Sequence, residues 1–500
     1  MGDVLHSAPA IRVRRCNDES LRVSGAYVLY WMISARRLQY NFAMDHALAY
    51  CRELRKPLVI FEALRCDYRW ASDRMHRFVI EGMADNQQAC EKAGVAYFPY
   101  IEPTRGAGCG LLQALSSRAC VVVTDEFPCF FLPNMVAAAS TKVGVRLEAV
   151  DSNGLLPLRA TEMVYPTAYA FRRFLQKALP AHLDDFPSAH ALQRRAVPER
   201  LAISEEVLVR WPMANLGSDD FSFVRSLPID HTVEPAEIRG GHREAVRRLK
   251  TFFDHRLPDY SEKRNEPQLD VASRMSPYLH FGHISTHEVF SELSGREGWT
   301  PEKLALRGNG SREGWWNMSA NAEAFLDELV TWRELGYNFT VHRRDYDQFK
   351  SLPPWALQTL KVHAKDQRKP SYSREQLESA RTYDVLWNAA QIQLIREGRI
   401  HNYLRMLWGK KILEWSRTPK EASETLVHLN NKYALDGRNP NSYSGIFWCL
   451  GRYDRPWGPE RPIFGKVRYM SSGNTARKVK VKNYLQKYAL SDNRVFAAAF

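Results

Sequence analysis

The stretch from Tyr383 to Trp415 reads YDVLWNAAQIQLIREGRIHNYLRMLWGKKILEW and indicates the fold of the second half of the chain. It predicts two consecutive helices separated by a break at Gly398. Trp408 and Trp415 are seven residues apart and share a helix face, and Trp387 lies on the preceding helix. Tryptophans at helical spacing are usually core residues. The polar side chains among them favour a buried planar cofactor with electron transfer instead; they are Asn388, Gln391, His401, Asn402 and Arg405.

Four segments carry a resemblance to a known family: 386–391, 401–415, 429–438 and 461–470. They are similar to motifs of the photolyase/cryptochrome flavoproteins, and specifically of the class II cyclobutane pyrimidine dimer (CPD) photolyases. The similarity is specific over residues 260–470 and weaker in the first 230 residues. It implies a carbon–carbon lyase that repairs CPDs in DNA with light, by electron transfer from excited, reduced FAD to a flipped-out dimer.

The bulk composition fits such a protein. The 500 residues suffice for two or three domains, and 45% of them are hydrophobic. The net charge of +14 favours a polyanionic partner such as UV-damaged DNA. The segment from Tyr443 to Tyr488 contains ten Lys or Arg residues and only two acidic residues, with aromatic residues interleaved. This mixture suits a surface that follows a DNA backbone, although a solvated basic tail is the simpler alternative.

Cysteine usage and the absence of apolar runs bear on the compartment. The eight cysteines form no Cys-x-x-Cys pair, which favours reduced thiols over disulfides or a zinc site. The sequence shows no secretory signal and no run of 18 apolar residues. We therefore expect an intracellular monomer without membrane contact, in the cytoplasm or nucleoid, or in the nucleus of a eukaryote.

The first third of the chain alternates short apolar runs with helical stretches. This alternation predicts an α/β domain with a doubly wound, Rossmann-like parallel sheet. From about residue 240 the pattern is almost wholly helical, and the resemblance implies that this all-α domain binds FAD. The strands are expected at 26–31, 57–61, 95–98, 120–124 and 145–150, and the helices at 38–53, 70–92 and 130–143. The predicted division is a flexible arm (1–20), an antenna-type domain (21–155), a connector (156–238), the helical catalytic domain (239–490) and a tail (491–500). Gly308–Arg312 is expected to be a loop.

The start of a helix at Ser276-Pro277 is a candidate phosphate site. A hydroxyl N-cap followed by proline begins a helix whose free N–H groups attract phosphate, although a plain capped helix is more common. The resemblance implies that this segment holds the FAD pyrophosphate. The cofactor-binding residues that it implies are Tyr260, Ser273, Met275, Ser276, Phe325, Arg333, Asn388, Arg405, Asp436 and Gly437. It also implies an antenna chromophore such as 8-hydroxy-5-deazaflavin in the first domain.

Three histidines follow on what the spacing predicts to be the same helix. His280, His283 and His287 are spaced i, i+3 and i+7, which could bind a metal. No acidic or cysteine fourth ligand stands out, so no metal site is predicted.

The substrate site rests on the resemblance. Glu328 and Trp332 are four apart on one helix, where a glutamate is usually a surface group. The resemblance implies that Glu328 instead hydrogen-bonds the flipped-out thymines and stabilises the charge on the dimer. Trp332 and Trp448 correspond to aromatic walls around it. The further implied DNA-binding residues are Met406, Arg455, Lys466, Arg468, Arg477 and Lys478.

The remaining implied roles concern electron transfer. Asn430 corresponds to an asparagine beside the flavin N5, and Asp436 and Arg405 to a salt-bridged pair beside the ring system. Trp408 corresponds to the electron donor nearest to FAD, Trp387 to the middle position and Trp415 to the outer one.

Three rivals share part of this pattern. A cryptochrome-type photoreceptor would keep FAD and the tryptophans without repair, but the short stretch after Tyr488 leaves little room for a signalling extension. A (6-4) photolyase is a second repair option, and a basic nucleic-acid-binding protein without a cofactor is the third.

Overall fold

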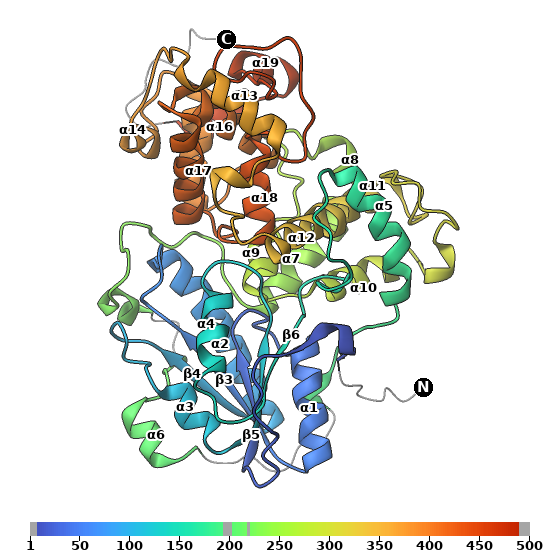
Figure 1. Ribbon diagram of the computed structural model, residues 1–500, viewed down its shortest axis with the longest axis vertical. Coiled ribbons are helices and arrows are strands. Elements are labelled where there is room, and N and C mark those ends of the chain that lie inside the picture. Colours follow the sequence, from blue (N-terminus) through green and yellow to red (C-terminus); the bar gives the residue numbers. More distant parts are fainter. Residues whose placement is uncertain (1–7, 194–202, 218–220, 490–500) are drawn as a thin grey trace.

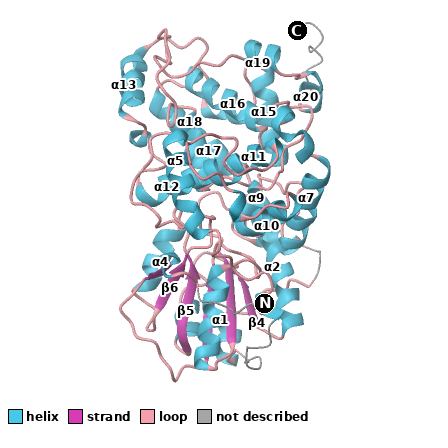
Figure 2. Cartoon of the chain, turned by 90° about the vertical axis from the view of Figure 1, so that its right-hand side faces the viewer, coloured by secondary structure: helices cyan, strands magenta, loops and turns pink. Residues whose placement is uncertain are grey.

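A computed structural model describes residues 8–193, 203–217 and 221–489 of the chain, which form a sheet-containing part and a helical part (Figures 1 and 2). The predicted tail 491–500 lies outside the described residues. Among the residues that are described, no helix has both the length and the apolar character needed to cross a membrane.

The first part contains one six-stranded sheet with the order β1-β6-β5-β2-β3-β4. Its strands are β1 Val13–Arg15, β2 Tyr27–Met32, β3 Leu58–Leu64, β4 Ala96–Ile101, β5 Ala119–Asp125 and β6 Leu147–Val150. The five strands β2 to β6 are parallel, as the sequence predicts, and β1 pairs with β6 in the antiparallel direction. The order reverses between β2 and β5, which places a crevice at the carboxyl ends of the strands.

The parallel strands are apolar because both faces of the sheet are buried. Along β2, Val28 and Tyr30 pack into one core cluster, whereas Tyr27 and Leu29 pack into the cluster on the opposite face. Four helices lie around the sheet (Figure 1); they are α1 Phe42–Leu54, α2 Asp73–Ala93, α3 Leu111–Ser116 and α4 Leu132–Ser140.

The prediction of a flexible arm over residues 1–20 is wrong for the residues that the structure describes. Strand β1 is hydrogen-bonded to β6, and Arg12 is completely buried. The Arg12 guanidinium donates to Asp151 Oδ2 at 3.4 Å and to the Leu155 carbonyl at 2.6 Å. These partners lie about 140 residues further along the chain, so no local pattern could reveal them.

The connector 156–238 contains two α-helices that the sequence analysis did not predict. They are α5 Ala168–Ala178 and α6 Glu205–Arg210. Helix α5 packs beside the helical part rather than on the sheet (Figure 1), and its Arg172 pairs with Asp327 at 2.8 Å.

The second part is helical, as predicted, and holds two core clusters. Its α-helices are α7 His242–His255, α8 Tyr260–Lys263, α9 Ser276–Phe281, α10 Thr286–Arg296, α11 Ala320–Leu326, α12 Arg333–His342, α13 Pro354–Val362, α14 Arg374–Glu378, α15 Val385–Glu397, α16 Asn402–Trp415, α17 Pro419–Tyr433, α18 Pro440–Trp448, α19 Ser472–Lys478 and α20 Lys482–Lys487. A π-helical turn, Asp327–Trp332, joins α11 to α12.

One arginine of the sheet part ties the two parts together. Arg74 on α2 donates to the carbonyl of Ile395 at 2.5 Å and to that of Tyr433 at 2.8 Å. These carbonyls belong to the last turns of α15 and α17, where they have no hydrogen-bond donor within their own helix. The orientation of the two helices therefore depends on a side chain from the other domain.

Candidate functional site

A cavity of about 230 Å³ lies among the helices of the second part. It is bounded by α8, the segment leading into α9, the α11–α12 rod, the start of α16 and the start of α18. Nine of the residues predicted for the site line it: Tyr260, Ser273, Met275, Ser276, Phe325, Glu328, Arg333, Arg405 and Asp436. The structure thus gathers side chains that are spread over 177 positions of sequence.

One end of this cavity is suited to phosphate. The hydroxyls of Ser273 and Ser276 lie beside two cations, Arg274 and Arg399, that also line the wall. Asp270 pairs with Arg274 and lies 3.6 Å from Arg399, so it holds both guanidinium groups at this end. Arg399 also pairs with Glu397 at 2.9 Å. The two guanidinium groups still offer several N–H donors, which favour a phosphate ligand.

The predicted cap at Ser276 is displaced by one residue. Met275 is the N-cap, Ser276 is the first residue of α9, and the Ser276 hydroxyl makes no capping bond. That hydroxyl is therefore available to a ligand, because the proline that follows fixes the first turn without help from a capping side chain.

Glu328 lies on the π-helical turn and is partly open to the cavity, with 34% of its side chain exposed. Arg264 donates to Glu328 Oε1 at 2.8 Å. Burial raises the pKa of Glu328, while the charge of Arg264 acts in the opposite direction. π-Helical turns inside α-helices are frequent at functional sites because they change which side chains share a face.

The pair Arg405–Asp436 lines the opposite wall, as predicted. The guanidinium lies 3.4 Å from both carboxylate oxygens, and 23% and 16% of the two side chains are exposed. Next to it, His401 Nδ1 is buried without a hydrogen-bond partner among the described residues. Burial and the charge of Arg399 lower the pKa of His401 to about 4, so its ring is neutral at pH 7.

Two of the ten predicted cofactor-binding residues, Asn388 and Gly437, do not line the cavity, nor does Asn430; the predicted tryptophans and DNA-binding residues lie outside its lining as well. Asn388 is buried, and its amide group is hydrogen-bonded to Thr382: it accepts from the Thr382 hydroxyl at 2.7 Å and donates to the Thr382 carbonyl at 2.8 Å. Gly437 lies in a tight turn, where a Cβ would be 2.9 Å from the carbonyl oxygens of Ala434 and Asn430. Asn430 is behind the wall and donates to the Ser442 hydroxyl, which does line the cavity.

The three tryptophans are completely buried and connected. The Trp408 indole N–H donates to Gln391 Oε1 at 2.8 Å, and the Trp387 indole N–H donates to the Trp408 carbonyl at 3.0 Å. The rings of Trp387 and Trp415 meet edge to face at 5.4 Å. The contacts therefore run from Trp408 through Trp387 to Trp415. Trp415, the predicted outer member, is only 1% exposed and so does not lie at the surface.

Trp332 and Trp448 stack on each other, with ring centroids 4.5 Å apart and planes inclined by 16°. No base fits between them at this separation, so they form one aromatic wall rather than two facing ones. Met406 is near this wall, in contact with Cys449 at 3.6 Å.

The predicted basic residues after α18 are organised around an aromatic ring. The guanidinium groups of Arg455 and Arg468 lie over the ring of Trp457 at 4.9 Å and 4.3 Å. Lys466 pairs loosely with Glu460 at 3.6 Å, and Arg477 and Lys478 are exposed at the end of α19. Trp457 was missed by the sequence reasoning.

The three histidines do not share a helix. Helix α9 ends at Phe281, Gly282 adopts a φ of +73°, and α10 begins at Thr286, so His283 lies between the helices. His283 and His287 are buried and His280 is half-buried, and desolvation lowers the pKa of each. Within the described part of the chain, no group of three potential metal ligands is found.

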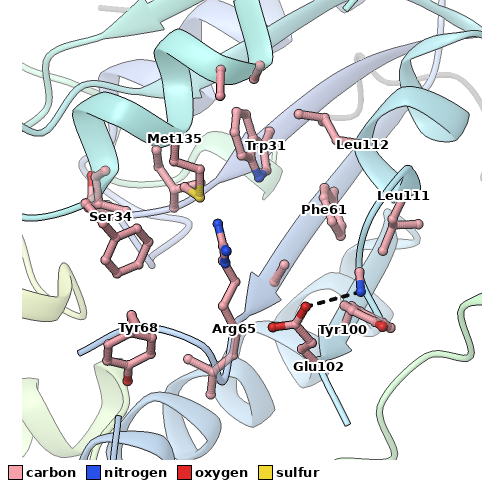
Figure 3. A pocket seen from close by; sticks show the side chains of 18 of the residues that line it. Trp31, Ser34, Phe61, Arg65, Tyr68, Tyr100, Glu102, Leu111, Leu112 and Met135 are labelled. Carbon is pink, nitrogen blue, oxygen red and sulfur yellow. Dashed lines mark hydrogen bonds between the residues drawn. The ribbon is translucent and has the colours of Figure 1, made fainter. Parts of the chain in front are cut away.

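A second cavity, of about 310 Å³, opens at the carboxyl ends of the strands (Figure 3). Trp31, Phe61, Tyr100, Leu111 and Met135 form apolar walls, and Arg65 reaches into the space between them. Figure 3 shows Glu102 at the floor, where its carboxylate accepts the N–H groups of the glycine-rich 106–108 turn at 3.1 and 3.2 Å.

The two cavities share a wall. On α9, Leu279 lines the helical cavity, while His280 and Phe281 line the one in the sheet part. The amide N–H of Asn439, also on the helical side, donates to His280 Nδ1 at 3.2 Å. One short helix thus separates the two sites.

Arg264, Arg274 and Arg399 are site residues that the sequence reasoning missed. Each is one of the 70 basic residues of the chain, and no spacing distinguishes it. Arg264 meets its carboxylate across 64 residues, a contact that only folding creates.

Known proteins align with nearly the whole chain. The deoxyribodipyrimidine photo-lyase of Methanothermobacter thermautotrophicus is 33% identical over 480 residues, which cover 96% of this chain and 98% of that protein. The chain belongs to the deoxyribodipyrimidine photo-lyase family. Photo-lyases of Potorous tridactylus and Oryza sativa subsp. japonica are 30% and 33% identical, over 98% and 92% of this chain and 88% and 87% of theirs. No protein-family model matches this photo-lyase chain.

Solved structures share the photo-lyase fold. An archaeal photolyase from Sulfolobus tokodaii with two FAD molecules has a TM-score of 0.65 at 14% identity, covering 92% of this chain and 90% of that one. A class III photolyase from Agrobacterium tumefaciens gives 0.64 at 16% identity, with 93% and 86% covered. A Synechocystis cryptochrome gives 0.63 at 15%, with 92% and 88% covered. The predicted fold class, an α/β domain followed by a helical domain, is confirmed.

Proposed function

We propose that this photo-lyase repairs cyclobutane pyrimidine dimers in DNA with light, as its class II resemblance implies. The observation that carries the proposal is the helical cavity, whose walls bring together a phosphate-binding end, the Arg405–Asp436 ion pair and the Glu328 carboxyl. A cryptochrome shares the fold, and the presence of Glu328, Trp332 and Trp448, which the resemblance assigns to the substrate, favours repair.

The residues of the cavity fit FAD. Ser273, Ser276 and the guanidinium groups of Arg274 and Arg399 would hold the pyrophosphate, and Tyr260 and Phe325 would contact the apolar parts. The unpartnered Nδ1 of His401 gains a hydrogen bond only from a ligand. When bound and reduced, FAD supplies the photoexcited electron that splits the dimer.

Glu328 acts on the substrate side of this cavity. Burial keeps its carboxyl easier to protonate than a surface glutamate, and a protonated carboxyl can donate a hydrogen bond to a thymine carbonyl. That bond strengthens as negative charge develops on the oxygen, which stabilises the reacting state more than the bound substrate. Arg264 holds the carboxyl in place and opposes its protonation until the dimer arrives.

The stacked Trp332 and Trp448 would offer one broad apolar face to the flipped-out dimer. A dimer stacks poorly in the duplex, so its extrusion costs less than that of intact bases. Beyond this face, the Arg455–Trp457–Arg468 stack together with Lys466, Arg477 and Lys478 would contact the phosphate backbone.

The buried tryptophans would carry electrons toward the helical cavity. Trp408, Trp387 and Trp415 are joined by hydrogen bonds and ring contact without intervening solvent. Asn430 would support the site from behind, through the Ser442 hydroxyl.

The cavity in the sheet part would hold an antenna chromophore. Its flat aromatic walls suit a planar ring system such as a deazaflavin or a second flavin, and Arg65 suits an anionic group on it. The Sulfolobus tokodaii structure, which contains two FAD molecules, is consistent with a second chromophore in this fold.

The deciding experiment illuminates the reduced protein with blue light in the presence of an oligonucleotide that carries one thymine dimer. Parallel samples carry a (6-4) lesion or stay dark. We expect intact thymines to reappear from the dimer only, and only in light. Bound, photoreducible FAD without repair would instead support a photoreceptor.

A further inference from the structure

An exposed loop next to the helical cavity has no role in the function described so far. It comprises residues 305–315, between Ala305 and Trp315, and is called the 305–315 loop below. Figure 1 shows this yellow segment projecting at the edge of the helical part, beside α5 and α11. Leu306 in this loop is 104% exposed, as much as in an extended peptide. Its side chain therefore contributes nothing to the core.

The loop is nevertheless held firmly. The Ala305 N–H donates to the Trp315 carbonyl at 2.9 Å and closes its base. The Gln176 amide on α5 accepts from Gly310 N at 2.7 Å and donates to the Ser311 carbonyl at 2.9 Å. Because the loop is hydrogen-bonded at its base and at its centre, Leu306 is held in a fixed position in solvent. Its exposure is not the result of a frayed chain segment.

Two glycines allow the loop to lie flat against α5. A Cβ on Gly308 would come within 2.6 Å of Gln176 Cβ. Gly310 has a φ of +81°, and a Cβ there would be 2.5 Å from Arg173 Cγ. Any other residue would push the loop away from the helix.

The surface around Leu306 is basic. Arg307 on the loop and Arg173 and Lys177 on α5 are all exposed. Within the described residues none of these three forms an ion pair, whereas two exposed acids, Glu302 and Glu313, lie on the same segment. Cations one helical turn apart on α5 share a face, so they can follow a row of phosphates.

The loop also approaches the helical cavity, because it contacts the residue that precedes the cavity-lining Glu328. Arg312 Nε lies 3.9 Å from Asp327 Oδ2, and Asp327 immediately precedes Glu328. The charge of Arg312 acts on the Glu328 carboxyl itself. A nucleic acid whose damaged base enters the cavity at Glu328 would therefore pass this loop.

We propose that the 305–315 loop and the adjoining face of α5 form a second DNA-contact surface, which rests on the proposed repair of DNA. Arg173, Lys177 and Arg307 contact phosphates of the strand beside the lesion. Leu306 packs against a base or sugar that the extruded dimer leaves unstacked, as apolar side chains do in distorted duplexes.

The test compares variants of the FAD-containing, full-length protein by fluorescence anisotropy. The probe is a labelled duplex with one thymine dimer, titrated at several salt concentrations, beside the same duplex without the dimer. The variants are Arg173→Gln with Arg307→Gln, and Leu306→Ser. The control is Lys92→Gln with Arg210→Gln, which removes the same charge from exposed positions on α2 and α6, at the other end of the molecule (Figure 1). Unfolding midpoints and flavin absorbance verify that each variant is folded.

We expect the double arginine variant to bind both duplexes more weakly and to lower the slope of log Kd against log salt by about 1.8, or about 0.9 per lost phosphate contact. Leu306→Ser should weaken binding of the dimer-containing duplex about tenfold and of the intact duplex much less. The control should match the wild-type slope.

The outcomes separate this inference from the function on which it rests. If the wild-type protein binds the dimer duplex with a steep salt slope but both variants match it, the loop is not a DNA contact and the inference is overturned. The inference is also overturned if Leu306→Ser alters only self-association in sedimentation, because the loop then joins copies of the chain. If the wild-type protein itself shows no preference for the dimer, the proposed function fails first.

Discussion

The ion pair Arg405–Asp436 can be tested with a double-mutant cycle. The single changes are Arg405→Gln and Asp436→Asn, which remove each charge and leave a polar amide; the second also keeps the size of the side chain. Either one leaves the remaining charge unpaired at the wall of the helical cavity, where 23% and 16% of the two side chains are exposed. The double variant removes both charges and so restores the balance.

The distance between the two charges sets the size of the expected coupling free energy. Two unit charges 3.4 Å apart attract by about 5 kcal/mol at an effective dielectric constant of about 20. Partial exposure weakens this attraction, so we expect a coupling of about 1–2 kcal/mol, between that of exposed pairs and that of fully buried ones. Each single variant should therefore bind FAD about tenfold more weakly, and the double variant should bind more tightly than the sum of the single losses predicts.

The assay measures FAD affinity of the four proteins by the fluorescence of released flavin. The matched control is the cycle Arg417→Gln and Glu421→Gln, a surface pair at 3.2 Å in which the arginine is 80% exposed. That cycle should leave FAD affinity unchanged. Strictly additive losses at Arg405 and Asp436, or equal effects in the control cycle, would refute the reasoning that the pair supports the cofactor site through its charge.

Three further predictions concern single groups. Glu328→Gln should slow repair by pre-reduced protein about tenfold or more while FAD stays bound, because an amide replaces the carboxyl that donates to the thymine carbonyl as charge develops on it. An unchanged quantum yield of repair would contradict this role of Glu328. Trp408→Phe should abolish photoreduction and spare repair by chemically reduced protein, and photoreduction that survives would show that electrons take another route. Burial raises the pKa of Glu334 from 4.5 to about 7, so its ionisation opposes folding and stability falls as pH rises through that range. Glu334→Gln should therefore flatten the decline between pH 5 and 8 by about 3 kcal/mol in urea unfolding, and parallel curves for the two proteins would exclude this effect.

Local patterns predicted much of the fold. The continuous apolar runs at β2 to β6 marked strands buried on both faces, and the helices around Trp387 and Trp408 followed from spacing. The edge strand β1 was missed because Val13–Arg15 is short and basic, and its order comes from pairing with β6. Helix α5 was missed although its buried residues recur at helical spacing, from Ala168 through Phe171 to Leu175. Only its partner, Asp327, lies far away in sequence.

The site divides in the same way. Sequence alone determined which residue types are present, and the motif resemblance identified nine residues that the structure brings to one cavity. Only the tertiary structure decided that Arg264 pairs with Glu328, that Asn388 turns away to hold Thr382, and that Trp332 stacks on Trp448. The physical reason is that side-chain direction and long-range ion pairing depend on how helices pack. A sequence fixes the periodicity of each helix, whereas the neighbour that its side chains meet is set by the fold as a whole.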